Sequence, residues 1–376
     1  MPKLEPISVT QQPLTLGSLT TWLRGLRQYG PIDSKYLPRA LYVTLSSLVS
    51  SPLRLLEEMY FHLPLSTAQS AQPPVFILGH WRSGTTHLHQ LMSLDPHLAY
   101  VSYLHACAPG LFLSNAGLVR MFLNQVLPAT RPMDNVSLSP DSPFEEEFGL
   151  ANLTDLSFCY GWYFPRIMQQ SFRHTVLLDT ATPQERDTWK RAYLHFLRKV
   201  SLATGGKRLV LKNPPNTARV KMLLELFPEA KFVHIYRNPY RVYFSMLGFY
   251  RKFLPLVTFQ DIGLEQLEAN IFWCYEQLMQ RYLDEKAYIP ASNLLEVCYE
   301  DLETAPLKTL EMIYQYLNLE SFAQSKPIFA EYIAAQSNYQ KNQYPSYDQV
   351  LLERIYKHWY LTIDLWGYKP PSSNIV

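Results

Sequence analysis

A short segment of the chain, residues 79–86, has the composition of a phosphate-binding loop. It follows an apolar run and reads Gly79-His-Trp-Arg82-Ser83-Gly84-Thr85-Thr86. Glycines let backbone N–H groups approach an anion closely, and the threonine hydroxyls add further donors. The two glycines have P-loop spacing, but Thr85 stands where the lysine that contacts the β- and γ-phosphates would be. We therefore expect a cradle for one phosphate and its attached group, without a metal ion; the alternative is a structural strand–turn–helix connection.

A second candidate anion site lies further along the chain, around Arg237. This arginine follows an apolar run at 232–236, and Ser245 comes eight residues later, two turns into the next predicted helix. A strand-end arginine and a helix hydroxyl suit a second, separate phosphate. Arg241 is a candidate third contact; its alternative is an arginine solvated on the helix surface.

Four short runs rich in Val, Ile and Leu are typical of buried parallel strands: 75–78, 209–211, 232–236 and 294–298. A helical pattern follows each run, at 85–94, 216–227, 240–250 and 305–317. This alternation predicts an α/β fold, a parallel sheet flanked by helices. Because the carboxyl ends of parallel strands share one sheet edge, the loop, Lys212 and Arg237 should meet there.

The rest of the chain is predicted to be mainly helical. Residues 100–205 form a helical, loop-rich insertion between the first two predicted strands, and such insertions commonly carry binding surfaces. Residues 1–70 are interpreted as a helical N-terminal extension, joined by a linker at 66–74 to a domain that spans 71–376. Two further helices are expected, at 262–283 and 350–365.

Four motifs, spread from about residue 74 to 303, resemble those of the sulfotransferases that use 3′-phosphoadenosine-5′-phosphosulfate (PAPS). The loop is similar to their 5′-phosphosulfate loop, usually Pro-Arg-Ser-Gly-Thr-Thr, and Lys212-Asn-Pro-Pro resembles their Lys-Ser-Pro segment. Arg237 and Ser245 match their 3′-phosphate site in type and spacing. Val297-Cys-Tyr299-Glu-Asp-Leu302 resembles the strand-end segment whose tyrosine lies near the adenine.

The resemblance implies the P-loop-like sulfotransferase fold and PAPS as the co-substrate, which leaves as 3′-phosphoadenosine-5′-phosphate (PAP), with no metal. It assigns the nucleotide to Arg82, Ser83, Gly84, Thr85, Thr86, Arg237, Ser245 and Tyr299. Trp81 departs from the proline usual before the loop arginine, and Asn216 stands where many relatives have a histidine. The Gly-rich C-terminal loop of the animal cytosolic enzymes is missing, so the bacterial-type branch is the closer comparison.

Sulfuryl transfer is an in-line displacement at sulfur. It needs a base for the acceptor and positive charge near the bridging oxygen that leaves with the nucleotide. Arg82 and Lys212 can supply this charge. Lys212 ends a predicted strand, which is where sites form in open α/β sheets; its alternative is an ordinary surface lysine.

The candidate base lies in the segment Ser142-Pro-Phe-Glu145-Glu146-Glu147-Phe148. Ser142 and Glu145 have capping-box spacing, which predicts a structural role for Glu145. At about 100° per residue, Glu147 borders the apolar face and Glu146 lies opposite, so Glu147 is the candidate base. Acidic residues are also favoured at helix N-termini for structural reasons. The alternative bases are His80, His87 and His105.

Composition narrows the classes of partner. Apolar residues at 47% and charged residues at 18% are typical of a globular protein, and a net charge of +2 gives no bulk attraction to nucleic acid. We expect buried free thiols in a reducing, cytoplasmic compartment, because no cysteine pair or histidine cluster has zinc-ligand spacing. The cysteines are Cys107, Cys159, Cys274 and Cys298.

The N-terminal region mixes leucines with arginines. Its most apolar charge-free run, 40–53, is shorter than the ~20 residues of a spanning helix, and no secretory signal opens the chain. Basic amphipathic helices here can pack on the domain, which is the reading preferred, on a membrane surface, or on an acyl substrate. The sequence has no feature that indicates an oligomeric state.

The acceptor class is indicated only by composition. With 26 Tyr, 19 Phe and 7 Trp, the insertion can line an apolar pocket, which favours a small-molecule or lipid acceptor, such as a lipid, polyketide or phenol, over a sugar. Two other functions fit parts of the pattern. A small-molecule kinase would need the missing lysine and a magnesium-binding aspartate. A non-catalytic nucleotide-binding module would not require Lys212 or the acidic residues that are candidates for the base.

Overall fold

The computed structural model describes residues 9, 12–67, 72–131, 137–336 and 348–371. The chain forms two compact units from discontinuous segments. Unit 1 consists of Met1–Gln69, Val101–Gly206 and Phe249–Leu267, and unit 2 of Ser70–Tyr100, Lys207–Gly248 and Glu268–Val376. The expected N-terminal extension and nearly all of the expected insertion thus belong to one unit, and all predicted strands belong to the other.

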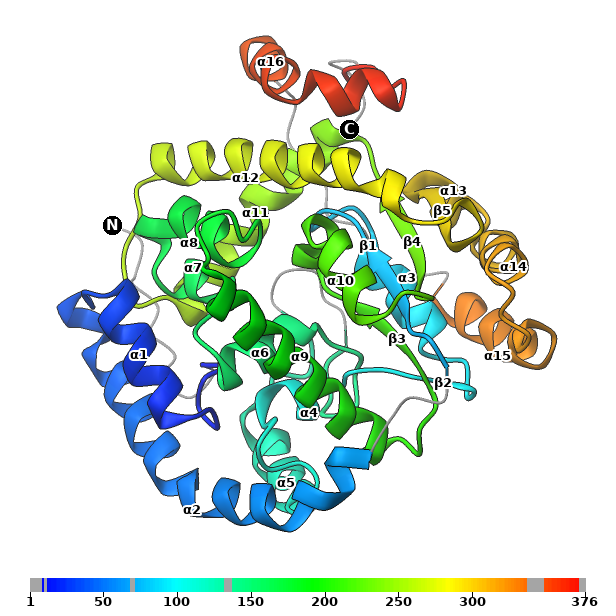
Figure 1. Cartoon of the computed structure of the whole chain (residues 1–376). Coiled ribbons are helices and arrows are strands. Elements are labelled where there is room, and N and C mark those ends of the chain that lie inside the picture. The colour runs from blue at the N-terminus through cyan, green and yellow to red at the C-terminus, as the bar shows by residue number, and fades with distance from the viewer. Residues whose placement is uncertain (1–8, 10–11, 68–71, 132–136, 337–347, 372–376) are drawn as a thin grey trace. The chain divides into compact units, whose positions relative to one another are not determined.

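Unit 2 is built around a parallel sheet, visible in Figure 1. Among the described residues, its strand order is β2-β3-β1-β4-β5. The strands are β1 (Val75–Leu78), β2 (Leu98–Ala99), β3 (Arg208–Lys212), β4 (Lys231–Tyr236) and β5 (Leu294–Cys298). The predicted α/β class is confirmed. Strand β2 was not predicted, because two residues are too short to carry a pattern.

The strand register brings several predicted site residues to one sheet edge. Ile77 of β1 is opposite Lys212 of β3, and Leu78 is opposite His234 of β4. Tyr236 at the end of β4 is opposite Cys298 at the end of β5. The loop after β1, Lys212, Arg237 and Tyr299 are therefore all at the carboxyl edge, where sites form in open parallel sheets.

Different helices cover the two faces of the sheet, because successive strand residues point to opposite sides. On one face, alternate strand residues such as Val75, Ile77 and Val233 share a buried core with the helices that follow β1 and β5. Those helices are α3 (Thr85–Met92), α13 (Tyr299–Thr304), α14 (Pro306–Tyr316) and α15 (Phe322–Ala335). On the other face, Phe76 stacks on Phe232 at 5.5 Å and contacts Phe227 after α10 (Val220–Leu226).

Most predicted helices form with shifted ends. The helix expected at 216–227 begins as a 3-10 turn, η3 (Pro214–Ala218), and α10 starts only after Arg219, whose φ of −123° is not helical. The helix expected at 240–250 is longer, α11 (Pro239–Val257), and passes from unit 2 into unit 1. The helix expected at 262–283 is α12 (Leu264–Glu285). Two 3-10 turns, η4 (Lys286–Tyr288) and η5 (Ala291–Asn293), lead into β5.

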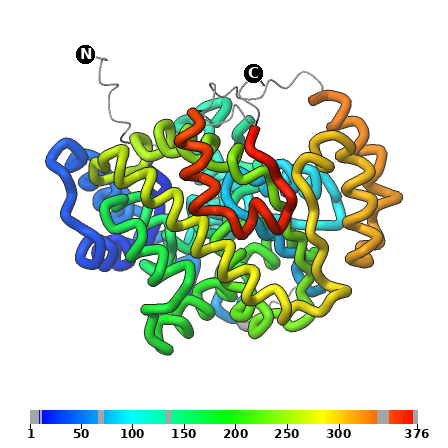
Figure 2. The backbone as a smooth tube through the Cα atoms, turned by 90° about the horizontal axis from the view of Figure 1, so that it is seen from above, coloured from blue at the N-terminus to red at the C-terminus, as the bar shows by residue number. Residues whose placement is uncertain are grey.

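The predicted C-terminal helix, α16 (Gln349–Leu365), packs across α12 (Figure 2). Trp359 stacks on Tyr275 with ring centroids 3.9 Å apart, and its indole N–H donates to the Phe272 carbonyl at 3.2 Å. These contacts bury the Trp359 side chain and attach the last helix to unit 2.

Unit 1 is helical and has an aromatic core. Trp162 is buried against Phe148, Phe158 and Phe253 at centroid distances of 5.8, 5.3 and 5.2 Å. None of the helices in the described ranges has the combination of length and apolar composition that membrane crossing needs. The elements are α1 (Leu19–Tyr29), η1 (Ser34–Tyr36), α2 (Leu37–Thr67), α4 (Tyr103–Cys107), α5 (Ala116–Val126), α6 (Glu146–Leu153), α7 (Cys159–Tyr163), η2 (Pro165–Ile167), α8 (Met168–Thr175) and α9 (Pro183–Ala203).

Candidate active site

The loop after β1 is held at its first residue, Gly79, by a side chain from the neighbouring strand connection. The Gly79 N–H donates to Oγ1 of Thr217 at 2.8 Å, and the Thr217 hydroxyl donates to the Gly79 carbonyl at 3.2 Å. Gly79 has a φ of +142°, and a Cβ there would lie 2.3 Å from the Ile235 carbonyl oxygen. The position therefore requires glycine. Sequence reasoning missed Thr217, and its place in Asn-Pro-Pro-Asn-Thr, directly after Lys212, was the available signal.

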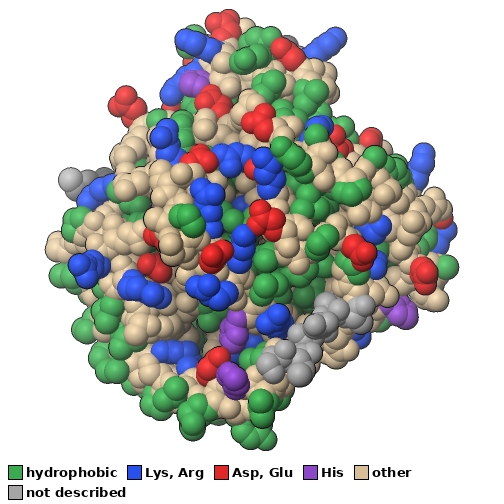
Figure 3. Space-filling view, in the orientation of Figure 1, with side chains coloured by type: hydrophobic (Ala, Val, Ile, Leu, Met, Phe, Trp, Pro, Cys, Tyr) green, Lys and Arg blue, Asp and Glu red, His purple; other side chains and the backbone are tan. Residues whose placement is uncertain are grey.

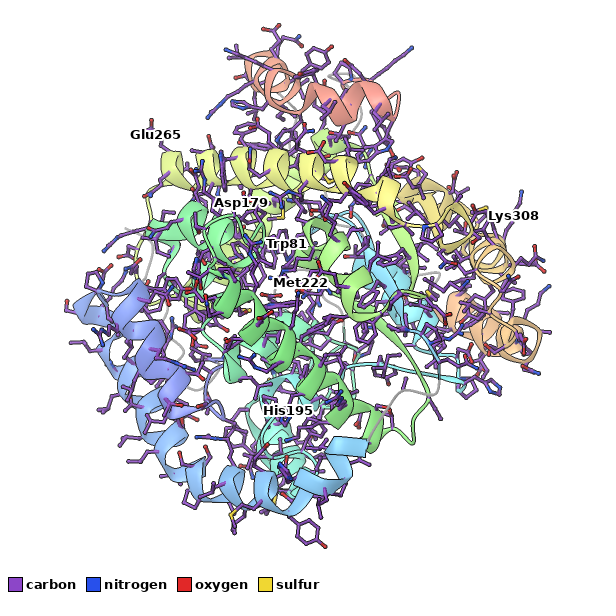
Figure 4. The ribbon with its side chains drawn as sticks, in the orientation of Figure 1. Trp81, Asp179, His195, Met222, Glu265 and Lys308 are labelled. Carbon is purple, nitrogen blue, oxygen red and sulfur yellow. The ribbon has the colours of Figure 1, made fainter. Side chains whose placement is uncertain are left out.

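The middle of the loop is fixed by its own hydroxyl and by an unusual backbone conformation. Ser83 Oγ donates to the His80 carbonyl at 2.6 Å and approaches the Ile235 carbonyl at 3.1 Å. Arg82 has a positive φ of 69°, which non-glycine residues rarely adopt. Ser83, predicted as a direct ligand, thus also has a structural role within the loop. Trp81, labelled in Figure 4, is buried beside His80.

Gly84 ends the loop and begins α3. It has a φ of +98°, and a Cβ there would lie 2.1 Å from Cδ2 of Tyr299. Thr85 and Thr86 are the first two residues of α3, so their backbone N–H groups are among those without an intrahelical acceptor. The helix start therefore offers N–H donors at the sheet edge, as the loop motif predicted.

The two predicted anion sites are connected within unit 2. Arg82 donates from Nε to Oγ of Ser245 at 2.9 Å. Arg237 donates from Nη1 to the Arg82 carbonyl at 3.2 Å, and its guanidinium lies over the Tyr299 ring at 4.3 Å. Residues from the loop, from the end of β4, from α11 and from the start of α13 thus form one cluster that carries two guanidinium groups.

This cluster has the properties that a nucleotide with two separated phosphates requires. The Nε of Arg237 is buried and makes no hydrogen bond within the described residues. A buried N–H without an acceptor is costly, and an anionic oxygen is the acceptor that a guanidinium satisfies best. Because Gly84 has no side chain, the Tyr299 ring can lie directly against the start of α3. The residues present therefore fit a 3′-phosphorylated nucleotide.

Lys212, the last residue of β3, is buried at 2% exposure, so it is not an ordinary surface lysine. Its charge contributes, after burial, to the lowered pKa of His89. The turn that follows is held by Asn216, whose Oδ1 accepts from Asn213 at 3.4 Å and from Arg219 at 3.3 Å. Asn216 thus organises the turn next to Lys212.

Glu147, the predicted base, lies in unit 1 on α6 and is fully buried. Its Oε1 accepts the Phe158 N–H at 2.7 Å, and its carbonyl accepts from Ser157 at 2.9 Å. Glu146 is also buried, as is every residue from 146 to 152, so α6 has no exposed side over this stretch. The prediction that Glu146 lies opposite the buried side of the helix is therefore wrong. Catalysis by Glu147 stays a prediction.

The predicted capping box at Ser142 and Glu145 is wrong. Helix α6 begins at Glu146, Glu145 itself is the N-cap residue without a side-chain cap, and Ser142 Oγ accepts from the Ser139 N–H instead. Pro143 is outside the helix and bridges to Ser102. The motif failed because the chain is still extended at Glu145, with φ of −87° and ψ of 134°.

The three histidine candidates differ in environment. Burial lowers the pKa of His80 to about 4, and its Nδ1 lies 2.8 Å from the Trp81 carbonyl, so the ring is neutral with its proton on Nδ1. Burial also lowers the pKa of His87. His105 belongs to unit 1, where its Nδ1 accepts the Ser102 N–H at 3.1 Å in a capping box that starts α4.

A family model described as the sulfotransferase family matches residues 73–324. Omega-hydroxy-beta-dihydromenaquinone-9 sulfotransferase of Mycobacterium tuberculosis is 31% identical over 362 residues, which cover 95% of this chain and 91% of that protein. The enzyme of the same name from Mycobacterium bovis matches equally.

Two solved structures share the fold. Sulfotransferase STF9 from Mycobacterium avium superposes with a TM-score of 0.68 at 16% identity, covering 94% of this chain and 97% of that one. Sulfotransferase STF1 from Mycobacterium tuberculosis gives 0.58 at 18% identity, covering 82% and 85%. The family match spans most of the chain and the curated relatives nearly all of it, and so this protein belongs to the sulfotransferase family of enzymes.

Proposed function

We propose that the protein transfers the sulfuryl group of PAPS to a hydroxyl or amine of an apolar acceptor. The observation that carries the proposal is the Arg82–Ser245 hydrogen bond of 2.9 Å, which joins the predicted phosphosulfate loop to the predicted 3′-phosphate site. A donor with a 5′-phosphosulfate and a 3′-phosphate on one nucleoside needs two anion sites at a fixed separation. A nucleoside triphosphate does not need two separated anion sites.

Each residue of the cluster has a proposed role. Backbone N–H groups of the loop and of Thr85 and Thr86 would hold the 5′-phosphosulfate. Arg237 and Ser245 would hold the 3′-phosphate, and Tyr299 would contact the base. Tyr299 already packs against Gly84 and under Arg237, so the loop, the arginine and the ring are positioned together.

The chemical step needs positive charge where the leaving oxygen becomes negative. The bond from sulfur to the bridging phosphate oxygen breaks as the bond from sulfur to the acceptor oxygen forms. Arg82 and Lys212 would stabilise the charge on the leaving oxygen, and a buried ammonium does this strongly because little water screens it. Glu147 would take the acceptor proton.

An apolar acceptor is favoured by aromatic content and by similarity. The matched mycobacterial enzymes are named for a hydroxylated dihydromenaquinone. We infer that the acceptor here is likewise a hydroxylated, mainly apolar molecule.

Two experiments test the proposal. Calorimetry with PAP in EDTA should give metal-independent binding that is tighter than AMP binding; binding no tighter than AMP contradicts the donor assignment. An acceptor screen with labelled donor and a panel of hydroxylated lipids, phenols and sugars should label an apolar acceptor. Magnesium-dependent ATP turnover without sulfuryl transfer would instead favour a kinase.

A further inference from the structure

The longest helix of unit 1, α2, has its polar and apolar sides reversed relative to an ordinary surface helix. Its buried positions include Arg39, Ser47, Ser50 and Glu57, whereas most of its large apolar side chains face outward, with Val43 and Leu65 as buried exceptions. Surface helices of globular proteins bury the apolar side and expose the polar one. The exposed apolar residues are Leu37, Leu41, Leu45, Leu48, Val49, Leu53, Leu55, Leu56, Met59, Tyr60 and Leu63; we call them the α2 apolar face.

The α2 apolar face is continuous. At about 100° per residue its members fall within an arc of about 160°, which contains no charged residue. From Leu37 to Leu63 it runs about 40 Å along the helix. Val49, Tyr60 and Leu63 are 76–79% exposed, the most open of the set. In Figure 3 hydrophobic side chains gather along the lower left margin, where Figure 1 draws α2.

The opposite side of α2 is fixed to unit 1 by charged contacts. Buried Arg39 donates to the carbonyls of Thr258 and Pro255. Buried Glu57 accepts from Lys199 Nζ at 2.5 Å and from the Ser114 hydroxyl at 2.6 Å. Removing either charge from its partners would be costly, so α2 stays on its unit and keeps the apolar face outward.

Charged residues occur at the borders of this face. Glu58 lies 3.5 Å from His195 of α9, a residue labelled in Figure 4, which directs the carboxylate sideways. Of the exposed basic residues that precede α2 in the chain, Arg24 pairs with Asp155 at 3.7 Å and Lys35 with Asp261 at 2.6 Å, while Arg27 lies in the last turn of α1. A long apolar arc without charge and with an exposed tyrosine has the composition of a helix side that lies in a membrane interface.

We propose that the α2 apolar face inserts into the surface of a lipid bilayer, with α2 parallel to the membrane plane. A peptide helix bound in a groove commonly uses anchors over two to three turns, whereas this face continues over seven turns. A second copy of the chain is the competing occupant, but a bilayer surface can cover an uncharged apolar face along its whole length, whereas the polar and charged rim typical of a protein interface is missing within this arc.

The test is flotation of the full chain with vesicles of phosphatidylcholine, alone or with one quarter phosphatidylglycerol, without donor or acceptor. Wild type should float with the vesicles. The double variant Leu45→Asp/Leu56→Asp should reduce the bound fraction at least about tenfold, because an aspartate in an apolar interface costs far more than a leucine. The matched control is Val350→Asp/Leu365→Asp, which changes two exposed apolar residues of α16 and should float like wild type.

Circular dichroism should be unchanged in both variants, since all four side chains are exposed. Wild type that stays unbound with both vesicle types overturns the proposal. An α2 variant that floats like wild type also overturns it. So does binding that 0.5 M salt abolishes and that is equal in wild type and the α2 variant. Light scattering that shows a wild-type dimer, broken by the α2 variant, with no flotation would assign the face to self-association. Because no turnover is measured, this proposal and the proposed sulfuryl transfer can fail separately.

Discussion

Arg82 donates a hydrogen bond to Ser245 across 2.9 Å, although 163 positions separate them in the chain. The contact connects the loop after β1 to the helix after β4. Arg82 makes this contact from a backbone conformation with a positive φ of 69°. The geometry of one proposed phosphate site is therefore coupled to that of the other, and substitutions on either side should affect binding of the whole nucleotide.

Arg237→Ala should weaken PAP binding by roughly 10- to 150-fold. The loss of a charge-assisted contact to a phosphate costs about 1.5–3 kcal/mol. Calorimetry in EDTA measures the effect, with Lys308→Ala on α14 as an exposed cationic control, labelled in Figure 4. Wild-type affinity in the Arg237 variant would mean that the 3′-phosphate binds elsewhere.

Thr217→Val should loosen the loop because Gly79 loses both hydrogen bonds to the threonine hydroxyl. A buried N–H without an acceptor costs about 1–3 kcal/mol, so both stability to urea and PAP affinity should fall. Thr217→Ser keeps the hydroxyl and should restore most of both. If serine and valine behave alike, the hydroxyl does not position the loop.

Acid should destabilise unit 2 through its buried histidines. Burial lowers the pKa of His80 to about 4 and, with the nearby charge of Lys212, that of His89 to about 3. The unfolded chain takes up these protons near pH 6.5, whereas the folded chain does so only near pH 4 and below. Stability is therefore complete above pH 6.5 and falls as the pH drops from 6.5 towards 4.

The His80 contribution alone amounts to about 3 kcal/mol below pH 4, of which about 2 kcal/mol is already lost at pH 5. Urea unfolding at pH 7.5 and pH 5 measures the loss, and His89→Gln should reduce it because glutamine does not titrate. If the stability of His89→Gln depends on pH as steeply as that of wild type, His89 does not take up a proton on unfolding between pH 7.5 and pH 5.

How much of the site could be predicted depends on how local its cause is. The loop, Lys212 and Arg237 follow directly from strand ends, so a sequence pattern was sufficient to locate them at one sheet edge. The Arg82–Ser245 and Thr217–Gly79 contacts join segments 163 and 138 positions apart. They depend on strand order and on one backbone angle, which no local pattern encodes.

Two segments show the limits of local rules. Ser142 and Glu145 have capping-box spacing, but the chain is still extended at Glu145, and α6 starts later. Helix α2 packs on its unit, as the preferred interpretation of the N-terminal region expected, but buried partners such as Lys199 and the Thr258 carbonyl select the side of the helix that carries Glu57 and Arg39. Sequence periodicity defines the two sides of a helix but not which side is buried.

Lys212→Ala should lower kcat far more than PAP affinity. The charge on the leaving oxygen grows only as the S–O bond breaks, so the interaction strengthens in the transition state. Calorimetry with PAP and initial rates with a labelled donor separate the two effects. Lys207→Ala, an exposed lysine just before β3, is the control and should leave both unchanged. Equal losses of affinity and rate would assign Lys212 to ground-state binding.

Glu147→Gln tests the proposed base. The amide oxygen of glutamine can still accept the Phe158 N–H, which the carboxylate accepts at 2.7 Å, so the fold should be retained. As the general base, Glu147 should contribute a factor of ~10² to 10⁴ to kcat, and its loss should remove the acidic limb of the pH–rate profile. PAP affinity should not change, because the proposed nucleotide contacts all lie in unit 2.

Glu146→Gln is the matched control, since Glu146 is equally buried on the same helix but has no proposed chemical role. Glu146→Gln should keep the kcat of wild type and the acidic limb of its pH–rate profile. Full activity of Glu147→Gln combined with an inactive His80→Gln would transfer the role of base to His80, whose neutral ring has its proton on Nδ1 and leaves Nε2 to accept one. With its pKa near 4, that base would keep the rate constant down to about pH 4.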